Sequence, residues 1–121
     1  MTKNFSFKLL LIFLIAFSFT FSFAQLEFSK WYFGNGAGLD FSSGSPFALT
    51  NGKLYTEEGC AAVSDANGNL LFYTNGISVW DRNHNIMPNG YDLAGGISST
   101  QSAMIIPFPG SNHKYYIFTV A

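Results

Sequence analysis

Asn-Gly pairs punctuate the chain after residue 25, and short β-prone runs lie between them. The five pairs are Asn35-Gly36, Asn51-Gly52, Asn67-Gly68, Asn75-Gly76 and Asn89-Gly90. An Asn-Gly pair between apolar runs is a strong hairpin signal, because both residues tolerate the positive φ angles of a type I′ turn. No window of helical length in this part has the 3.6-residue period of an amphipathic helix. The sequence after residue 25 is therefore predicted to be all-β.

The β-prone runs predict short strands and a repeat. Strands are expected at 31–33, 46–50, 53–56, 61–64, 70–74, 77–80, 102–106 and 115–120. Segment 71–76 resembles 31–36, and segments 60–63 and 70–74 resemble 102–105 and 115–119. Similar segments about 40–45 residues apart, with four short strands per unit, are typical of β-propeller blades. A sandwich or meander of aromatic-rich hairpins is the alternative.

The predicted fold is thus a propeller-like array of four-stranded antiparallel meanders over 25–121. Residues 31–56 would form an incomplete first blade that lacks its opening strand, 60–88 a full blade, and 102–120 the first hairpin of a third. Closed propellers contain about 4–8 blades. We therefore expect 25–121 to be the truncated N-terminal portion of a larger propeller-like domain.

Residues 1–24 have the features of a secretory signal peptide, which we expect to be helical. Two lysines, Lys3 and Lys8, precede an apolar run over 9–21, and small residues at 22 and 24 predict cleavage between Ala24 and Gln25. An uncleaved anchor is the alternative, but the apolar stretch is shorter than the roughly 20 residues that a spanning helix needs. We expect recognition by the export machinery, secretion or display at the cell surface, and no stable membrane span after cleavage.

Composition excludes several classes of protein. Only 11% of the residues are charged and the formal net charge is −1, which excludes a nucleic-acid binder with a basic surface and a charge-rich disordered chain. The single cysteine, Cys60, cannot form an intrachain disulfide and is predicted to be a small buried hydrophobe. His84 and His113 are expected in exposed loops, because a zinc site requires three or four ligands.

Two Asp-Asn segments are weak calcium-loop candidates. Asp65 and Asn67 form one, and Asp81, Asn83 and Asn85 form the other. Oxygen ligands at alternate positions can surround a hard cation, but the second segment lacks the Gly at position six and the Glu at position twelve of a calcium loop. The alternative is that these side chains cap their own turns. We predict no catalytic residue, no cofactor and no established metal site.

An ordered series of motifs resembles a known family. It comprises WYFGNGAGLDF over 31–41, SDANGNLLFYT over 64–74, VWDRNH over 79–84 and STQS over 99–102. The series is similar to the N-terminal region of large secreted Bacteroidota proteins that end in a gliding-motility-associated, type B sorting domain of the type IX secretion system. The resemblance implies a propeller-like region and, in a longer parent, delivery to the cell surface. It transfers no catalytic residue.

We therefore expect an exported, non-catalytic protein of the binding or adhesion type, and a fragment of a larger type IX-secreted protein. Its ligand would be a glycan or another surface molecule. Aromatic side chains can stack on sugar rings, although apolar alternation assigns most of them here to the core. The alternative is a secreted hydrolase, acting on glycans or peptides, whose active centre lies outside this sequence.

Overall fold

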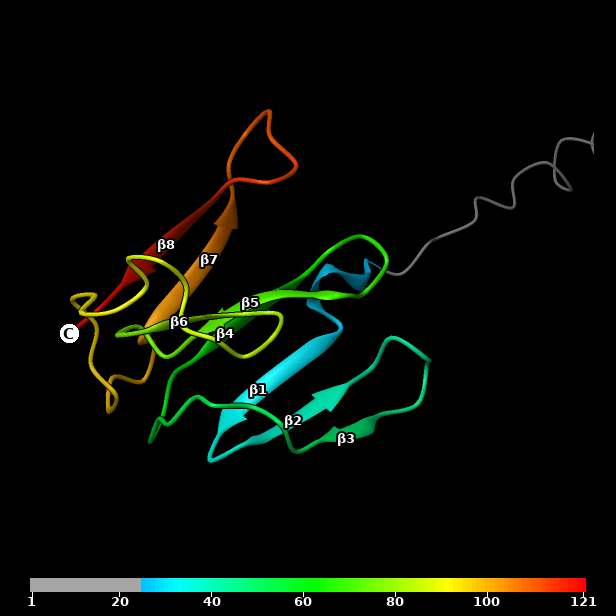
Figure 1. Ribbon diagram of the computed structural model, residues 1–121, viewed down its shortest axis with the longest axis horizontal. Helices are drawn as coiled ribbons and strands as arrows, with labels where there is room; N and C mark the ends of the chain where they lie inside the picture. Colours follow the sequence, from blue (N-terminus) through cyan, green and yellow to red (C-terminus); the bar gives the residue numbers. More distant parts are fainter. Residues whose placement is uncertain (1–24) are drawn as a thin grey trace, which may run out of the picture.

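A computed structural model describes residues 25–121, which form three small antiparallel sheets without an α-helix (Figure 1). Sheet A contains β1 (Lys30–Gly34), β2 (Ala37–Asp40) and β3 (Phe47–Leu49); sheet B contains β4 (Ala61–Ser64), β5 (Leu70–Thr74) and β6 (Val79–Asp81); sheet C contains β7 (Ala103–Pro107) and β8 (Tyr115–Thr119). A 3-10 turn, η1 (Leu26–Phe28), precedes β1. The all-β prediction is confirmed for this part of the chain. The predicted signal peptide, including Ala24, lies outside the described residues.

The three sheets are stacked in the order A, B, C. Strand β1 contacts β4, and β4 contacts β7, so the first strands of successive sheets are neighbours. Residues of sheets A and B, together with Leu54, share one core cluster: Tyr32, Leu54, Leu70, Tyr73 and Trp80. Residues of sheets B and C share a second cluster: Val63, Phe72, Val79 and Ile105. Sheet B is therefore covered on both faces, whereas A and C are each covered on one. No closed propeller is formed by these sheets.

One sheet lies in each of the three segments for which a blade was predicted, but the strands within them differ in two ways. Sheet B has three strands and only an isolated bridge between Trp80 and Ile86 in place of a fourth, because the chain reverses at once in a tight turn after β6. The resemblance of 31–36 to 71–76 predicts that β1 and β5 occupy the same position in their sheets. Instead, β1 is the first strand of sheet A, and the first strand of sheet B is β4. Both segments run into an Asn-Gly turn, which explains the resemblance without an equivalent position in the sheet.

Most predicted strands are present, but segment 53–56 is not one. Its residues alternate between exposed and buried, as they would in a β-strand. No neighbouring strand, however, forms a β-ladder with this segment. Instead, Thr56 Oγ1 donates to the carbonyl of Ile97 (3.0 Å). Strand β2 was not predicted because its glycine-rich sequence has little β propensity. It pairs with β1 through a turn at Asn35 and Gly36.

The Asn-Gly turns differ in type. Asn35 (φ 53°) and Gly36 (φ 80°) are the only Asn-Gly pair in the described chain with positive φ at both residues, as a type I′ turn requires. At the pairs 67–68 and 75–76 only the glycine is positive, and at 89–90 only the asparagine. The type I′ prediction is therefore correct for one pair and wrong for the other four. At 67–68 and 75–76, side-chain oxygens of Asp65, Thr74 and Asn75 accept backbone N–H groups of the turn and favour another geometry.

Candidate functional site

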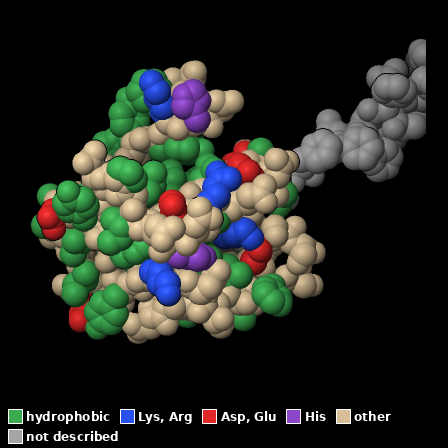
Figure 2. Space-filling model, viewed as in Figure 1, with side chains coloured by type: hydrophobic (Ala, Val, Ile, Leu, Met, Phe, Trp, Pro, Cys, Tyr) green, Lys and Arg blue, Asp and Glu red, His purple; other side chains and the backbone are tan. Residues whose placement is uncertain are grey.

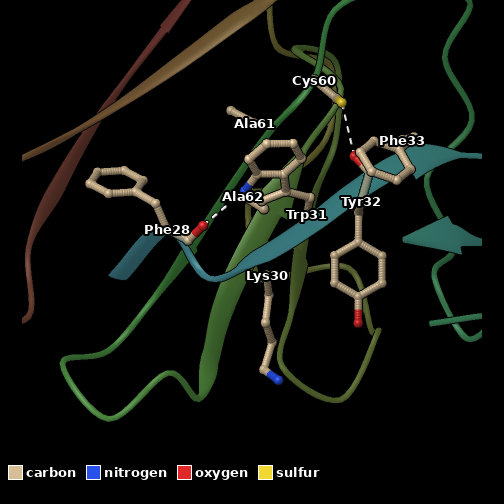
Figure 3. A pocket seen from close by; sticks show the side chains of 8 residues that line it. All are labelled: Phe28, Lys30, Trp31, Tyr32, Phe33, Cys60, Ala61 and Ala62. Atoms are coloured by element: carbon tan, nitrogen blue, oxygen red, sulfur yellow. Dashed lines mark hydrogen bonds between the residues drawn. The ribbon is translucent and has the colours of Figure 1, made fainter. Parts of the chain in front are cut away.

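An open apolar groove lies between η1, β1 and the start of β4 (Figure 3). It has a volume of about 270 Å³ and is lined by Phe28, Lys30, Trp31, Tyr32, Phe33, Cys60, Ala61 and Ala62. We call it the β1–β4 groove. Its size fits one sugar ring or one large side chain. It is formed by segments about 30 residues apart in the sequence, so no local motif indicates it.

Alternation along β1 turns two aromatic side chains outward at the groove. Tyr32 points into the core, whereas Trp31 and Phe33 on either side of it are exposed. The indole of Trp31 is held in place because its Nε1 donates to the carbonyl of Phe28 (2.8 Å). Its ring also packs against Phe41 at a centroid distance of 5.0 Å. The groove therefore presents a fixed aromatic wall.

Cys60 lies between this wall and the core. Its Sγ donates to the carbonyl of Tyr32 (2.9 Å), and its side chain packs against the core cluster between sheets A and B. Burial raises the pKa of the Cys60 thiol, so it is not a thiolate at neutral pH. The thiol is half-buried, which agrees with a small packing residue.

The groove carries little charge, because its one cation is paired. Lys30 Nζ forms an ion pair with Asp40 across β1 and β2. Burial of the Asp40 carboxylate raises its pKa, but hydrogen bonds from Lys30 and Ser42 and the positive charge of Lys30 outweigh this and lower the pKa to about 2. Asp40 is therefore ionised at neutral pH, and the pair is intact. A groove of this kind suits an uncharged ligand.

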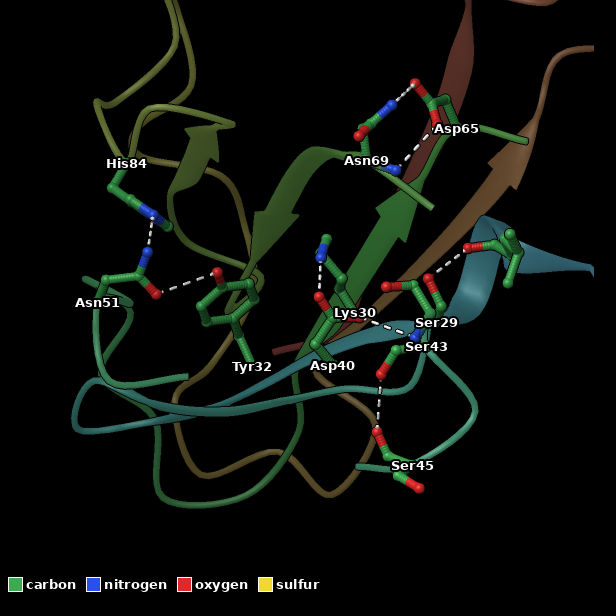
Figure 4. A network of polar contacts seen from close by, with 12 residues as sticks. Ser29, Lys30, Tyr32, Asp40, Ser43, Ser45, Asn51, Asp65, Asn69 and His84 are labelled. Atoms are coloured by element: carbon green, nitrogen blue, oxygen red, sulfur yellow. Dashed lines mark hydrogen bonds and ion pairs between the residues drawn. The ribbon is translucent and has the colours of Figure 1, made fainter. Parts of the chain in front are cut away.

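A polar-aromatic cluster joins sheets A and B on the other side of Tyr32 (Figure 4). Tyr32 Oη donates to Asn51 Oδ1 (3.3 Å), and Asn51 Nδ2 lies 2.8 Å from His84 Nε2. His84 Nδ1 in turn lies 3.0 Å from Tyr73 Oη, which also accepts the backbone N–H of Lys53 (3.0 Å). His84 lies in a turn, as predicted, but it is half-buried rather than exposed, whereas His113 is exposed in its loop.

The cluster is structural. Burial raises the pKa of Tyr32 to about 12 and also raises that of Tyr73, so both phenols stay protonated at neutral pH. Tyr73 is completely inaccessible to solvent and cannot reach a substrate. Two tyrosines, an asparagine and a histidine also supply no carboxylate to orient the histidine as a general base. The cluster holds sheet A against sheet B.

The calcium-loop candidates cap their own turns. Asp65 Oδ1 accepts the backbone N–H groups of Asn67 and Asn69 (both 2.9 Å). The Asn69 side chain donates to the other oxygen, and these hydrogen bonds lower the pKa of Asp65. This geometry agrees with the turn-capping interpretation.

The second candidate repeats this geometry. Asp81 Oδ1 accepts the N–H groups of Asn83 (2.8 Å) and Asn85 (2.9 Å). Both segments begin where a strand ends, since β4 ends just before Asp65 and β6 ends at Asp81. Within residues 25–121, no three His, Cys, Asp or Glu side chains are grouped so that they could hold a metal ion.

The same part of the chain contains no helix with the length and apolarity that crossing a membrane requires. Comparisons with family models, curated proteins and solved structures found no match to this sequence. Within residues 25–121, the β1–β4 groove is one feature that is open to a ligand.

Proposed function

We propose that this chain is an exported, non-catalytic binding protein of the cell surface that recognises an uncharged glycan through the β1–β4 groove. The observation that carries the proposal is the exposed aromatic group at the groove, formed by Phe28, Trp31 and Phe33. Exposed apolar groups that gather at one place mark interaction sites more often than scattered ones do. The C–H face of a sugar ring packs well on such aromatic rings, and its hydroxyl groups remain in water.

The neutral lining supports this ligand class. Lys30 is paired with Asp40, so binding a charged group would require breaking an ion pair at the groove. A neutral sugar requires no such change. Trp31 is already fixed by its bond to Phe28, so little side-chain entropy is lost when a ligand stacks on it.

Export and the propeller-like architecture belong to the same proposal. The apolar run over 9–21 and the small residues before Gln25 support secretion. The consecutive packing of sheets A, B and C, with first strands as neighbours, supports a propeller-like array. The motif series over 31–102 supports a place among Bacteroidota proteins delivered by the type IX secretion system.

Retention on polysaccharides tests the binding proposal. The processed chain would be run by affinity electrophoresis through gels containing xylan, a β-glucan or a mannan. We expect retardation by at least one of them, and an affinity at least about fivefold weaker for Trp31→Ala, since one stacked ring contributes on the order of 1 kcal/mol or more. Tyr91→Ala is the matched control, because Tyr91 is an exposed aromatic residue outside the groove.

Two results would contradict the proposal. Retardation that is equal for the wild type and Trp31→Ala would place binding elsewhere. Release of reducing ends from the same polysaccharides would show an enzyme, in agreement with the alternative of a secreted hydrolase.

A further inference from the structure

Sheet C has a second apolar face that nothing in residues 25–121 covers. Its exposed side chains are Met104, Ile106, Phe108, Tyr116, Phe118 and Val120. We call them the outer face of sheet C. Figure 2 shows apolar side chains gathered over the region where Figure 1 places β7 and β8. The opposite face of the same hairpin packs on sheet B through Ile105, Tyr115 and Ile117.

The outer face is ordered by strand pairing. Met104 lies opposite Phe118, and Ile106 lies opposite Tyr116. The Tyr116 ring is 5.2 Å from that of Phe108 and 5.9 Å from that of Phe118, measured between centroids. Strands with one face in water alternate apolar and polar residues, whereas β7 and β8 are apolar on both faces. This pattern is typical of a sheet covered on both sides, as sheet B is.

The exposed area suffices for an interface. Six large side chains, each about half exposed, leave on the order of 500 Å² of apolar surface. Patches of this size are at the upper end for a soluble monomer. Two such faces in contact would bury about 1,000 Å², the area at which a specific interface becomes plausible.

The two ends of the hairpin carry opposite charge. Lys114 lies at the turn end, with its Nζ 6.0 Å above the Phe108 ring. Glu57 and Glu58 lie near the other end of the hairpin. The backbone N–H groups of both residues donate to the carbonyl of Ile97. The neighbouring Gly96 N–H donates to the carbonyl of Val120, the residue that follows β8 (3.0 Å). Two copies packed with their hairpins antiparallel would bring each lysine toward the acidic end of the other copy.

We propose that a second copy of this chain covers the outer face of sheet C, about a two-fold axis and with the two hairpins antiparallel. A two-fold axis brings the same face of the two copies together. The apolar centre of one face then meets the apolar centre of the other, and the basic end of each hairpin meets the acidic end of its partner. The β1–β4 groove is lined by η1, β1 and the start of β4 and includes no residue of sheet C, so it stays open in both copies. The inference does not depend on what the groove binds.

Sedimentation velocity at about 1–100 μM tests the dimer. The chain would be expressed with residues 1–24, so that export and processing occur, and then purified. We expect a dimer that Phe118→Lys converts to a monomer at all these concentrations. Phe118 is 54% exposed, so the fold should persist, which a thermal melt verifies; Met104→Lys is a second variant on the same face. Phe47→Lys is the matched control, because Phe47 is an exposed strand residue of sheet A, 68% accessible.

Charge reversal tests the antiparallel arrangement. Lys114→Glu should raise the dissociation constant about fivefold at low salt, and adding Glu58→Lys should restore it. A wild-type chain that is monomeric at about 100 μM, or a dimer that survives both Phe118→Lys and Met104→Lys, would overturn the proposal. A dimer insensitive to Lys114→Glu would overturn the antiparallel orientation. Either result leaves the binding of glycans to the groove unaffected, so the two proposals fail separately.

Discussion

Replacing Trp80 with alanine removes the largest side chain from the core between sheets A and B. Trp80 lies in β6 directly opposite Tyr73 of β5 and is 9% exposed. Its indole stacks on the Tyr73 ring at a centroid distance of 5.5 Å and an interplanar angle of 11°. The other tryptophan, Trp31, is 50% exposed at the β1–β4 groove. The two tryptophans therefore form a matched pair that differs in burial.

The size of the effect follows from area and stacking. A buried tryptophan removes about 200 Å² from water, which at about 25 cal/mol/Å² gives up to 5 kcal/mol. Residual compactness of the unfolded chain reduces this by roughly a quarter. Loss of the stacking contact with Tyr73 adds about 1 kcal/mol. We expect Trp80→Ala to lower the free energy of unfolding by about 5 kcal/mol, at the upper end of the usual range for such substitutions, and Trp31→Ala by less than about 1 kcal/mol.

Urea denaturation followed by far-ultraviolet circular dichroism measures both variants, because this signal does not depend on a tryptophan reporter. A domain stable by only 5–15 kcal/mol could be partly unfolded after Trp80→Ala. Trp80→Phe then provides a milder version, with an expected loss of about 1–2 kcal/mol. A loss below about 0.5 kcal/mol for Trp80→Ala, or equal losses for the two tryptophans, would refute the assigned packing of sheet A on sheet B.

Three further predictions concern single residues. The pKa of Asp40 is lowered in the folded state to about 2, so its ion pair with Lys30 contributes stability that is present above about pH 4 and is lost as pH falls toward 2. Thermal melts between these pH values should show less acid destabilisation for Asp40→Asn than for the wild type, and parallel curves would contradict this. Burial raises the pKa of Cys60, so an aromatic disulfide reagent should react slowly with the folded chain and rapidly in urea; a rate equal to that of free cysteine would place the thiol in solvent. Gly36→Ala should cost about 1–2 kcal/mol in a urea titration because the residue has a φ of 80°, and an unchanged midpoint would show that the turn adapts.

Strands whose pattern is set locally could be predicted from the sequence. Strands β4 (Ala61–Ser64) and β5 (Leu70–Thr74) match the predicted ranges residue for residue, because the turn between them is closed by a short-range cap from Asp65. Segment 53–56 has an equally good pattern, but pairing depends on a neighbour, which the local sequence does not encode. Each sheet is built from strands that are consecutive in the sequence and joined by short connections, so the division of the chain into three sheets could also be predicted.

The groove and the polar-aromatic cluster could not be predicted in this way. Cys60 meets Tyr32, and Asn51 meets His84, only after sheet B packs on sheet A. The pairs are separated by 28 and 33 residues, respectively. His84 was expected in water because its local sequence is a polar turn, and its actual partners come from other segments. The alternation of Trp31 and Phe33 around Tyr32 was the one available signal, since it places two aromatic residues on one face of a strand.

The stack of Tyr32, Tyr73 and Trp80 gives the interface between sheets A and B an optical signature. The Tyr32 and Tyr73 rings are 4.5 Å apart with planes 17° apart, and Trp80 continues the stack on the other side of Tyr73. Electronic transitions of rings so close and so nearly parallel couple, and excitation of either phenol can pass to the indole. Near-ultraviolet dichroism and tyrosine-sensitised tryptophan emission therefore report on the docking of sheet A. Because Tyr73 and Trp80 both belong to sheet B, their coupling remains when sheet A leaves, and only the contribution of Tyr32 is lost. A partial loss of both signals with an unchanged far-ultraviolet spectrum would identify a state in which the strands persist but sheet A has separated from sheet B.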